Sequence, residues 1–163
     1  MNGTVKDVPS LQAPGFIKAA SYFRDGPFND VSAAISGDLI LDVRSSTAQY
    51  TGFRISVAAG TLSPEYACAS EGVNPLSGGC FKAKFLVPTG KEFSEVRIPF
   101  NTFSDYWRRA TGDQTITCSE DPKVCPKAND LKNIKSIEIW AEGVKGDVHL
   151  EVRSIAAGVN TDV

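Results

Sequence analysis

Apolar and polar residues alternate one by one along several short segments of this chain. Around position 40, Leu39 and Leu41 fall on one face of an extended backbone and Asp42 falls on the other. The same alternation recurs in the segments 53–57, 81–87, 96–100, 137–141 and 148–153, and more weakly around 16–19 and near Val5. This pattern predicts half-buried strands whose apolar side chains point inward and whose charged side chains face the solvent.

Turns separate these strands, and helix is scarce. The turn-forming groups are Asp25-Gly26-Pro27, Pro88-Thr89-Gly90 and Lys145-Gly146-Asp147. Only the segment 101–109 predicts a short helix, with Asn101 or Thr102 as its cap and two arginines near its end. We expect one all-β, antiparallel domain, a sandwich or a barrel, over residues 1–157, followed by a frayed tail at 158–163.

Four cysteines lie in two close pairs along the sequence, Cys68 with Cys80 and Cys118 with Cys125. An even number fits a disulfide framework of an oxidising compartment, and four cysteines allow three connectivities. We favour local pairing, because the segment between the second pair reads as a turn-forming loop. Free thiols are an alternative. Zinc is another, although the spacings differ from the short ligand spacings of structural zinc sites.

The charge balance and the hydrophobic pattern narrow the range of partners. Seventeen Lys and Arg residues against nineteen Asp and Glu give a net charge of −2, so we expect no nucleic-acid partner. No apolar run approaches the length of a transmembrane helix. The first residues, 1–7, lack the basic start and apolar stretch of a secretory signal. If the cysteines pair, we expect a targeting segment to be missing from this sequence.

Catalytic motifs are absent from the sequence. The single histidine, His149, alternates with Val148 and Leu150 and is predicted to face outward. We found no nucleophile elbow, phosphate-binding loop or dinucleotide fingerprint. The acids considered as a glycosidase pair are Asp38, Asp42, Glu138, Glu142, Asp147 and Glu151, and nothing singles out two of them. We therefore expect no enzyme activity, no catalytic residue and no cofactor.

One loop offers oxygen ligands for a calcium ion. Asp25, Asn29 and Asp30 lie within six residues of one another. Asp and Asn more often form local backbone hydrogen bonds in such a turn. We favour the turn and predict no metal site.

Aromatic residues are the remaining candidates for binding. Tyr50, Tyr66, Trp107 and Trp140 are possible platforms for a carbohydrate. Tyr106, Trp107, Arg108 and Arg109 lie together, and aromatic and Arg residues are enriched at protein-binding hot spots. We predict a partner-binding surface from these four residues and Trp140. The alternative is that Trp107 anchors a loop on the sandwich and the arginines are only solvated. Trp140 is either exposed or covered by a second layer.

Several segments carry a resemblance to a known family. They are Leu39 to Arg44, Tyr50 to Ile55, Phe81 to Phe85 with Pro88 and Gly90, Val96 to Phe103, Leu131 to Ile139, and Gly146 to Val152. In order and spacing over residues 35–155 they resemble the complex I intermediate-associated protein family. Arg97-Ile98-Pro99-Phe100 followed by Phe103 is the most specific piece. The resemblance implies a galactose-binding-like jelly-roll sandwich and a non-catalytic assembly factor of mitochondrial complex I, with relatives in chloroplasts and cyanobacteria.

Two features depart from that family. The usual first hairpin is not visible, so we expect the chain to start inside the domain. The cysteines lie in inserted loops, 61–80 and 110–127, that the matrix-facing factor does not share. We therefore expect an assembly factor or accessory subunit of a membrane redox complex, of the respiratory complex I or photosystem type. Its location would be the thylakoid lumen, another chloroplast compartment or the mitochondrion. The alternative is a secreted carbohydrate-binding module.

Overall fold

The structure is a computed structural model that describes residues 1–22, 28–60, 68 and 79–159. It is mostly β, with 45% strand and 12% helix, and its paired strands are antiparallel. This content confirms the all-β class and the low helix content that the alternating pattern predicts.

The larger sheet has four strands in the order β4-β9-β6-β7. Its strands are β4 (Phe16–Tyr22), β9 (Ser136–Glu142), β6 (Phe53–Ala58) and β7 (Cys80–Lys84). In its middle, Ile139 of β9 pairs with Ala19 of β4 on one side and with Ile55 of β6 on the other. β-Branched residues such as Ile139 and Ile55 suit this position because they pack well on a pleated surface.

The smaller sheet has three strands in the order β11-β5-β8. They are β11 (Glu151–Gly158), β5 (Asp38–Arg44) and β8 (Ser94–Pro99). Along β5, Leu39, Leu41 and Val43 are buried, whereas Ile40 and Asp42 between them are partly exposed. The structure therefore confirms the period-two prediction for this strand.

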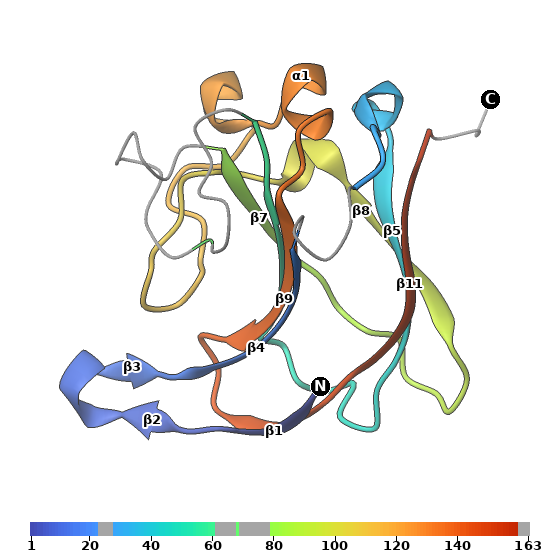
Figure 1. The fold of residues 1–163 in the computed structure, drawn as a ribbon. Helices are drawn as coiled ribbons and strands as arrows, with labels where there is room; N and C mark the ends of the chain where they lie inside the picture. Colours follow the sequence, from blue (N-terminus) through green and yellow to red (C-terminus); the bar gives the residue numbers. More distant parts are fainter. Residues whose placement is uncertain (23–27, 61–67, 69–78, 160–163) are drawn as a thin grey trace.

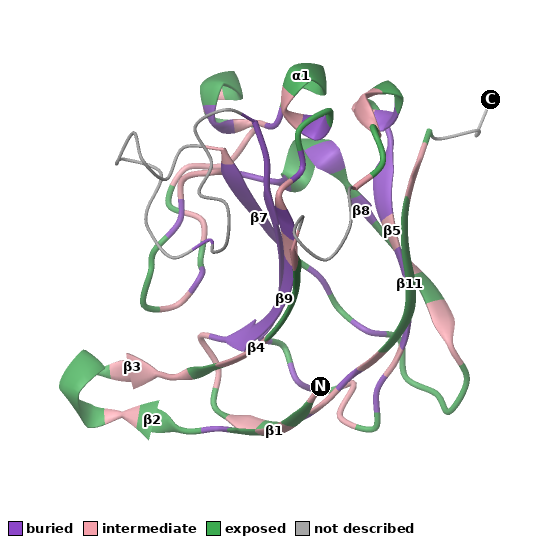
Figure 2. Cartoon of the chain, in the orientation of Figure 1, coloured by how far each residue is buried: buried purple, intermediate pink, exposed green. Residues whose placement is uncertain are grey.

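The two sheets share one hydrophobic core. Leu41 and Val43 of β5 belong to the same buried cluster as Phe53 and Ile55 of β6. In Figure 1, β4, β7 and β9 lie on one side of the molecule and β5, β8 and β11 on the other. Figure 2 shows buried residues along β5, β7 and β9. Each such side chain contributes about 1.5–3 kcal/mol through burial, so the packing of the two sheets holds the sandwich together.

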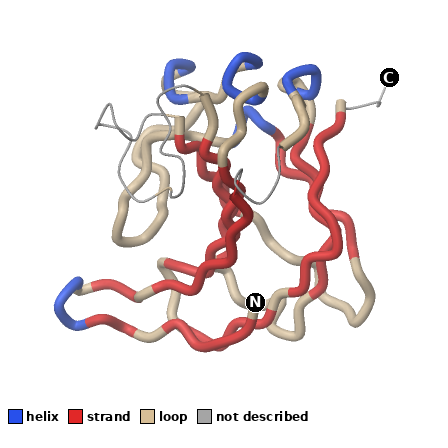
Figure 3. Tube along the Cα trace, viewed as in Figure 1, coloured by secondary structure: helices blue, strands red, loops and turns tan. Residues whose placement is uncertain are grey.

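Shorter elements join and close the sheets. The two small ladders are β1 (Asn2–Val5) with β10 (Gly146–His149), and β2 (Asp7–Val8) with β3 (Ala13–Pro14). The helical elements in the described residues are α1 (Ala128–Leu131) and the 3₁₀ turns Pro9–Leu11, Ser32–Ala34, Phe100–Thr102 and Pro122–Val124. Figure 3 shows most of them at one end of the sheets, and the first at the tip of the β2–β3 hairpin, which projects from the body.

The predicted helix over residues 101–109 is wrong. Helical geometry is confined to the turn Phe100–Thr102. Ser104 then pairs with Lys82 of β7 in an antiparallel bridge, and Arg108 N–H donates to the Asp113 carbonyl, so these backbone groups form their hydrogen bonds outside a helix. Thr102 Oγ1 donates to the Pro99 carbonyl at 2.7 Å, and its side chain therefore acts at the end of a turn instead of capping a helix.

The predicted strand over 148–153 is divided between two ladders. Leu150 is buried at the break, where the chain passes from β10 to β11. β11 then continues to Gly158, which pairs with Asp38, so the expected tail does not begin at this residue. Residues 160–163 lie outside the described part of the chain.

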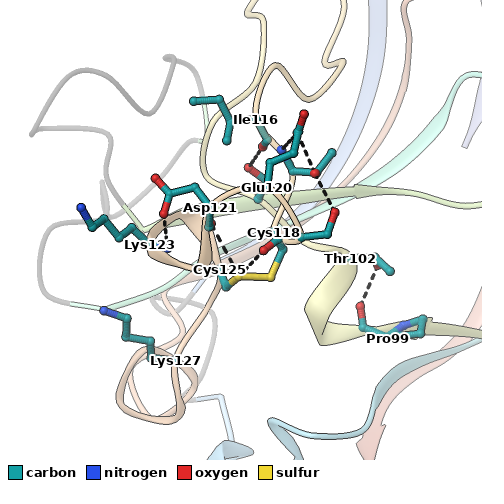
Figure 4. The surroundings of a disulfide bond; sticks show 12 residues. Pro99, Thr102, Ile116, Cys118, Glu120, Asp121, Lys123, Cys125 and Lys127 are labelled. Atoms are coloured by element: carbon teal, nitrogen blue, oxygen red, sulfur yellow. Dashed lines mark hydrogen bonds between the residues drawn. A yellow bond between two sulfur atoms is a disulfide. The ribbon is translucent and has the colours of Figure 1, made fainter.

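The structure confirms the local pairing of the cysteines. Cys68 is bonded to Cys80 and Cys118 to Cys125, with Cα separations of 5.5 and 5.0 Å. Figure 4 shows the second disulfide within its turn, where Asp121 Oδ1 accepts the backbone N–H of Lys123. Free thiols and zinc, the two alternatives, are therefore not what these four residues form.

Candidate functional site

The outward face of the four-stranded sheet is buried over most of β6, β7 and β9. The alternation places Arg54, Lys82 and Glu138 at positions predicted to face solvent, with Glu142 at the end of the same row on β9. Their exposed fractions are only 3%, 1%, 0% and 3%, in that order. The prediction that these four charged side chains point into water is therefore wrong, whereas Lys84 at the end of β7 is exposed as predicted.

A segment after β8 covers this face, and we call residues 104–117 the covering segment. Lys82 N–H donates to the Ser104 carbonyl at 2.8 Å, and Ser104 N–H donates back at 3.2 Å. Gln114 Nε2 donates to the Lys82 carbonyl at 2.7 Å. Gly112 lies against Glu142, so close that a Cβ there would collide with Glu142 Oε1. These contacts hold the covering segment on the sheet and exclude water from the charges.

The buried charges are neutralised in pairs. The pairs on this face are Lys82–Glu142, Lys18–Glu138 and Arg54–Asp113. In the first, Lys82 Nζ lies 2.6 Å from Glu142 Oε1. Arg54 also donates to the Glu142 carbonyl at 2.7 Å. Because an unpaired buried charge is costly, this pairing is a condition for covering the sheet at all.

Lys82 lies between two indole rings. Its Nζ is 3.8 Å from the ring centroid of Trp107 and 4.1 Å from that of Trp140. Burial lowers the pKa of Lys82 to about 8, and the carboxylate of Glu142 opposes this decrease. The indole faces also favour the charged ammonium. Lys82 therefore carries its proton at neutral pH and is held by one carboxylate and two rings.

We expect the free energy of unfolding to rise between about pH 8 and pH 10. The unfolded chain keeps the Lys82 proton up to its ordinary pKa of 10.5, whereas the folded chain releases it near 8. The unfolded state thus binds more protons in this window, and stability increases with pH. Above about pH 10 the free energy of unfolding should fall again. Burial raises the pKa of Tyr50 to about 12, so the folded chain keeps the Tyr50 proton in a pH range in which the unfolded chain has lost it. Urea unfolding at a series of pH values measures this profile.

The matched variants of that experiment are Lys82→Met/Glu142→Leu, which removes both charges, and Lys84→Met, which removes an exposed lysine of the same strand. The first should flatten the rise and the second should leave it unchanged. A rise that persists without Lys82 would mean that another group titrates.

Trp107 and Trp140 are buried, at 2% and 5% exposure. Trp107 Nε1 donates to the Cys80 carbonyl at 3.0 Å, and Trp140 Nε1 donates to Ser56 Oγ at 2.8 Å. Trp107 thus anchors the covering segment, as the alternative interpretation proposed, and Trp140 lies under the second layer. Neither ring is an exposed platform.

A cleft of about 710 Å³ opens beside these residues. The hairpin side contributes Leu11, Pro14 and Phe16, the floor Lys82 and Trp140, and the covering segment Arg109. Leu11 and Phe16 are 61% and 62% exposed. The Phe16 ring packs 5.2 Å from the ring of Trp140, so this apolar wall continues into the buried layer.

The structure brings three of the five predicted partner-binding residues to this cleft. Trp107, Arg109 and Trp140 line it, and only Arg109 among them is exposed. Tyr106 is half-buried and Arg108 exposed, and neither is among the lining residues. The sequence interpretation missed Leu11 in the turn Pro9–Leu11 and Phe16 at the start of β4, since no motif distinguishes an exposed apolar residue from one that points into the core.

The other chemical candidates have local structural partners. His149 Nδ1 accepts the backbone N–H of Ser46 at 3.2 Å, and its Nε2 lies 3.4 Å from Glu151. The six acids considered above are engaged as follows: Asp38 with Arg97, Asp42 with Arg153, Glu138 with Lys18, Glu142 with Lys82, Glu151 with Arg44, and Asp147 with Thr4.

Asp25, one of the three predicted calcium ligands, lies outside the described residues, and so do Tyr66 and most of the loop 61–80. Asp30 Oδ1 accepts the backbone N–H of Ser32 at 2.9 Å, which is the local turn bond of the alternative interpretation. Among the described residues, no group of three or more His, Cys, Asp or Glu side chains could hold a metal ion. No helix in that same part of the chain is long and apolar enough to cross a membrane.

Fold and site together define an all-β protein with two disulfides and a layer of buried ion pairs beside an open cleft. No protein-family model matches the chain, and no curated protein matches its sequence. The resemblance to the complex I intermediate-associated family therefore depends on the residues quoted above and stays a prediction.

Proposed function

We propose that this chain is a non-enzymatic protein-binding domain that serves as an assembly factor or accessory subunit of a membrane redox complex. The observation that carries the proposal is the pair of exposed apolar side chains, Leu11 and Phe16, at the rim of the cleft. They lie on and beside a hairpin that projects from the body (Figure 1). Apolar side chains gathered in this way are typical of a surface that a partner covers.

The class of complex comes from the sequence resemblance and the disulfides. The resemblance favours a galactose-binding-like jelly roll and a complex of the respiratory complex I or photosystem type. Disulfides such as Cys68–Cys80 and Cys118–Cys125 persist in oxidising compartments. Together they favour a thylakoid lumen, another chloroplast compartment or a mitochondrial compartment on the oxidising side.

A secreted carbohydrate-binding module is the second candidate. The indole rings of Trp107 and Trp140 beside Lys82 and Glu142 favour it, because sugars bind to aromatic faces with polar neighbours. Both ring faces, however, already carry the Lys82 ammonium, and both rings are buried. The exposed side chains that line the cleft include the apolar Leu11 and Phe16, which favours a protein ligand.

Native purification at physiological salt should recover the chain with subunits of respiratory complex I or of a photosystem. A Leu11→Ser/Phe16→Ser variant should reduce this recovery by about tenfold or more, because it removes the two exposed apolar side chains of the rim. The matched control is Leu86→Ser, since Leu86 is equally exposed, at 61%, and does not line the cleft.

Recovery of the wild-type chain alone would contradict the proposed function. Equal recovery by all three proteins would remove the cleft rim from the interface. Binding to a glycan array that Leu11→Ser/Phe16→Ser abolishes would favour the carbohydrate-binding candidate instead.

A further inference from the structure

The accessible part of the cleft has two walls of different chemistry. One wall is apolar and consists of Leu11 and Phe16 from the hairpin side. The other is the covering segment, from which Arg109 lines the cleft with an exposed side chain. A ligand between these walls meets an apolar surface and a guanidinium at once.

Arg109 brings the one uncompensated charge among the cleft-lining residues that the structure describes. On the floor, Lys82 is neutralised by Glu142 at 2.6 Å. The nearby cations Lys18 and Arg54, which do not line the cleft, are paired with Glu138 and Asp113. Within residues 1–22, 28–60, 68 and 79–159, no carboxylate pairs with Arg109. The described lining of the cleft therefore offers one uncompensated positive charge, that of Arg109, to whatever binds in it.

We propose that this cleft binds a peptide segment of the partner in which an apolar side chain lies next to a carboxylate. The inference rests on the proposed function, because it names the part of a protein partner that the cleft receives. The apolar side chain would pack on Leu11 and Phe16, and the carboxylate would pair with the Arg109 guanidinium. Arg suits this role because its planar group binds both oxygens of a carboxylate.

The charges of the cleft decide against a basic or neutral ligand. A basic peptide would bring a second cation beside Arg109. Among the lining residues that the structure describes, the one acid is Glu142, and its carboxylate is buried and paired with Lys82. A sugar would find the rings of Trp107 and Trp140 already covered by the Lys82 ammonium.

Fluorescence anisotropy with short synthetic peptides tests the inference directly. The probes share a labelled Gly-Ser frame and differ only at two central residues, which are Phe-Asp, Phe-Asn, Phe-Lys or Gly-Asp. The Phe-Asp peptide should bind about tenfold or more tightly than each of the others, because only it matches both walls. This preference should weaken as salt is raised.

The variant Arg109→Glu should abolish the preference for Phe-Asp and favour Phe-Lys instead. Arg108→Glu is the matched control, because Arg108 is also exposed but does not line the cleft, and it should leave the preference unchanged. Circular dichroism of both variants verifies that they fold as the wild type does.

Equal binding of the Phe-Asp and Phe-Lys peptides to the wild type would overturn the inference, and so would an unchanged preference in Arg109→Glu. The two proposals fail separately. If Arg109→Glu still recovers the native membrane complex in full, the inference is wrong while the proposed function stands. If the chain purifies alone but binds the Phe-Asp peptide selectively, the inference about the ligand of the cleft is supported and the proposed role in a redox complex is wrong.

Discussion

Replacing Glu142 by Gln should lower the free energy of unfolding by about 3–5 kcal/mol at pH 7. The substitution keeps the volume of the side chain but leaves the Lys82 ammonium buried without its counter-charge. Burial has already lowered the pKa of Lys82 to about 8. Lys82 can therefore release its proton when its counter-charge is removed, and this release limits the loss of stability. Urea denaturation followed by far-ultraviolet circular dichroism measures the loss.

Two controls separate the burial of this pair from the presence of charge as such. The double variant Lys82→Met/Glu142→Leu should recover most of the lost stability, because it leaves no unpaired group under the covering segment. Asp7→Asn breaks an ion pair with Lys145 whose two side chains are largely exposed, and it should change stability by less than about 1 kcal/mol. A Glu142→Gln variant as stable as Asp7→Asn would show that water reaches Lys82.

The variant Trp107→Ala should destabilise the fold by about 3–5 kcal/mol. It removes a fully buried indole, its hydrogen bond to the Cys80 carbonyl and the ring beside Lys82. Trp107→Phe keeps an aromatic ring and should cost less, about 1–2 kcal/mol, chiefly through the lost N–H donor. The midpoints of thermal and urea unfolding measure both changes.

Arg108→Ala is the control next to it, and as an exposed residue it should shift stability by no more than about 0.5 kcal/mol. Trp107 therefore stabilises the domain. A loss of partner binding in Trp107→Ala would result from unfolding and would not show that Trp107 contacts the partner. If Trp107→Ala unfolds at the wild-type midpoint and loses only partner binding, the hot-spot interpretation of the sequence is restored.

The period-two pattern predicted the strands well because it reports on local backbone geometry. Leu39 and Leu41 alternate with partly exposed residues in the structure, as they do in the sequence. The same pattern at Lys82 and Glu138 led to the wrong environment, because a polar residue at an outward position looks identical whether water or another segment covers it. The covering segment contacts these residues from elsewhere in the chain, and no local signal reports such a contact.

The residue types of the candidate site were informative only in part. The clustering of Trp107 with Arg109 on one short segment singled out two residues that line the cleft. It did not show that the indole turns inward to the sheet while the guanidinium stays outside. The expected helix over 101–109 failed for a related reason, since the backbone of Ser104 finds its hydrogen-bond partners on β7. Tertiary pairing overrode the local helical signal there.

The fit of the covering segment has a consequence for protein engineering. Gly112 and Gly143 both have a φ of +71°. A Cβ on Gly112 would collide with the Glu142 carboxylate, and a Cβ on Gly143 would collide with the carbonyl oxygen of Thr111 in the covering segment. A loop transplanted onto this sheet would need to bring a carboxylate for Arg54 and to pass Glu142 without a side chain. Binding specificity can thus be redesigned at the exposed Arg109, whereas the loop that carries it has to be kept whole.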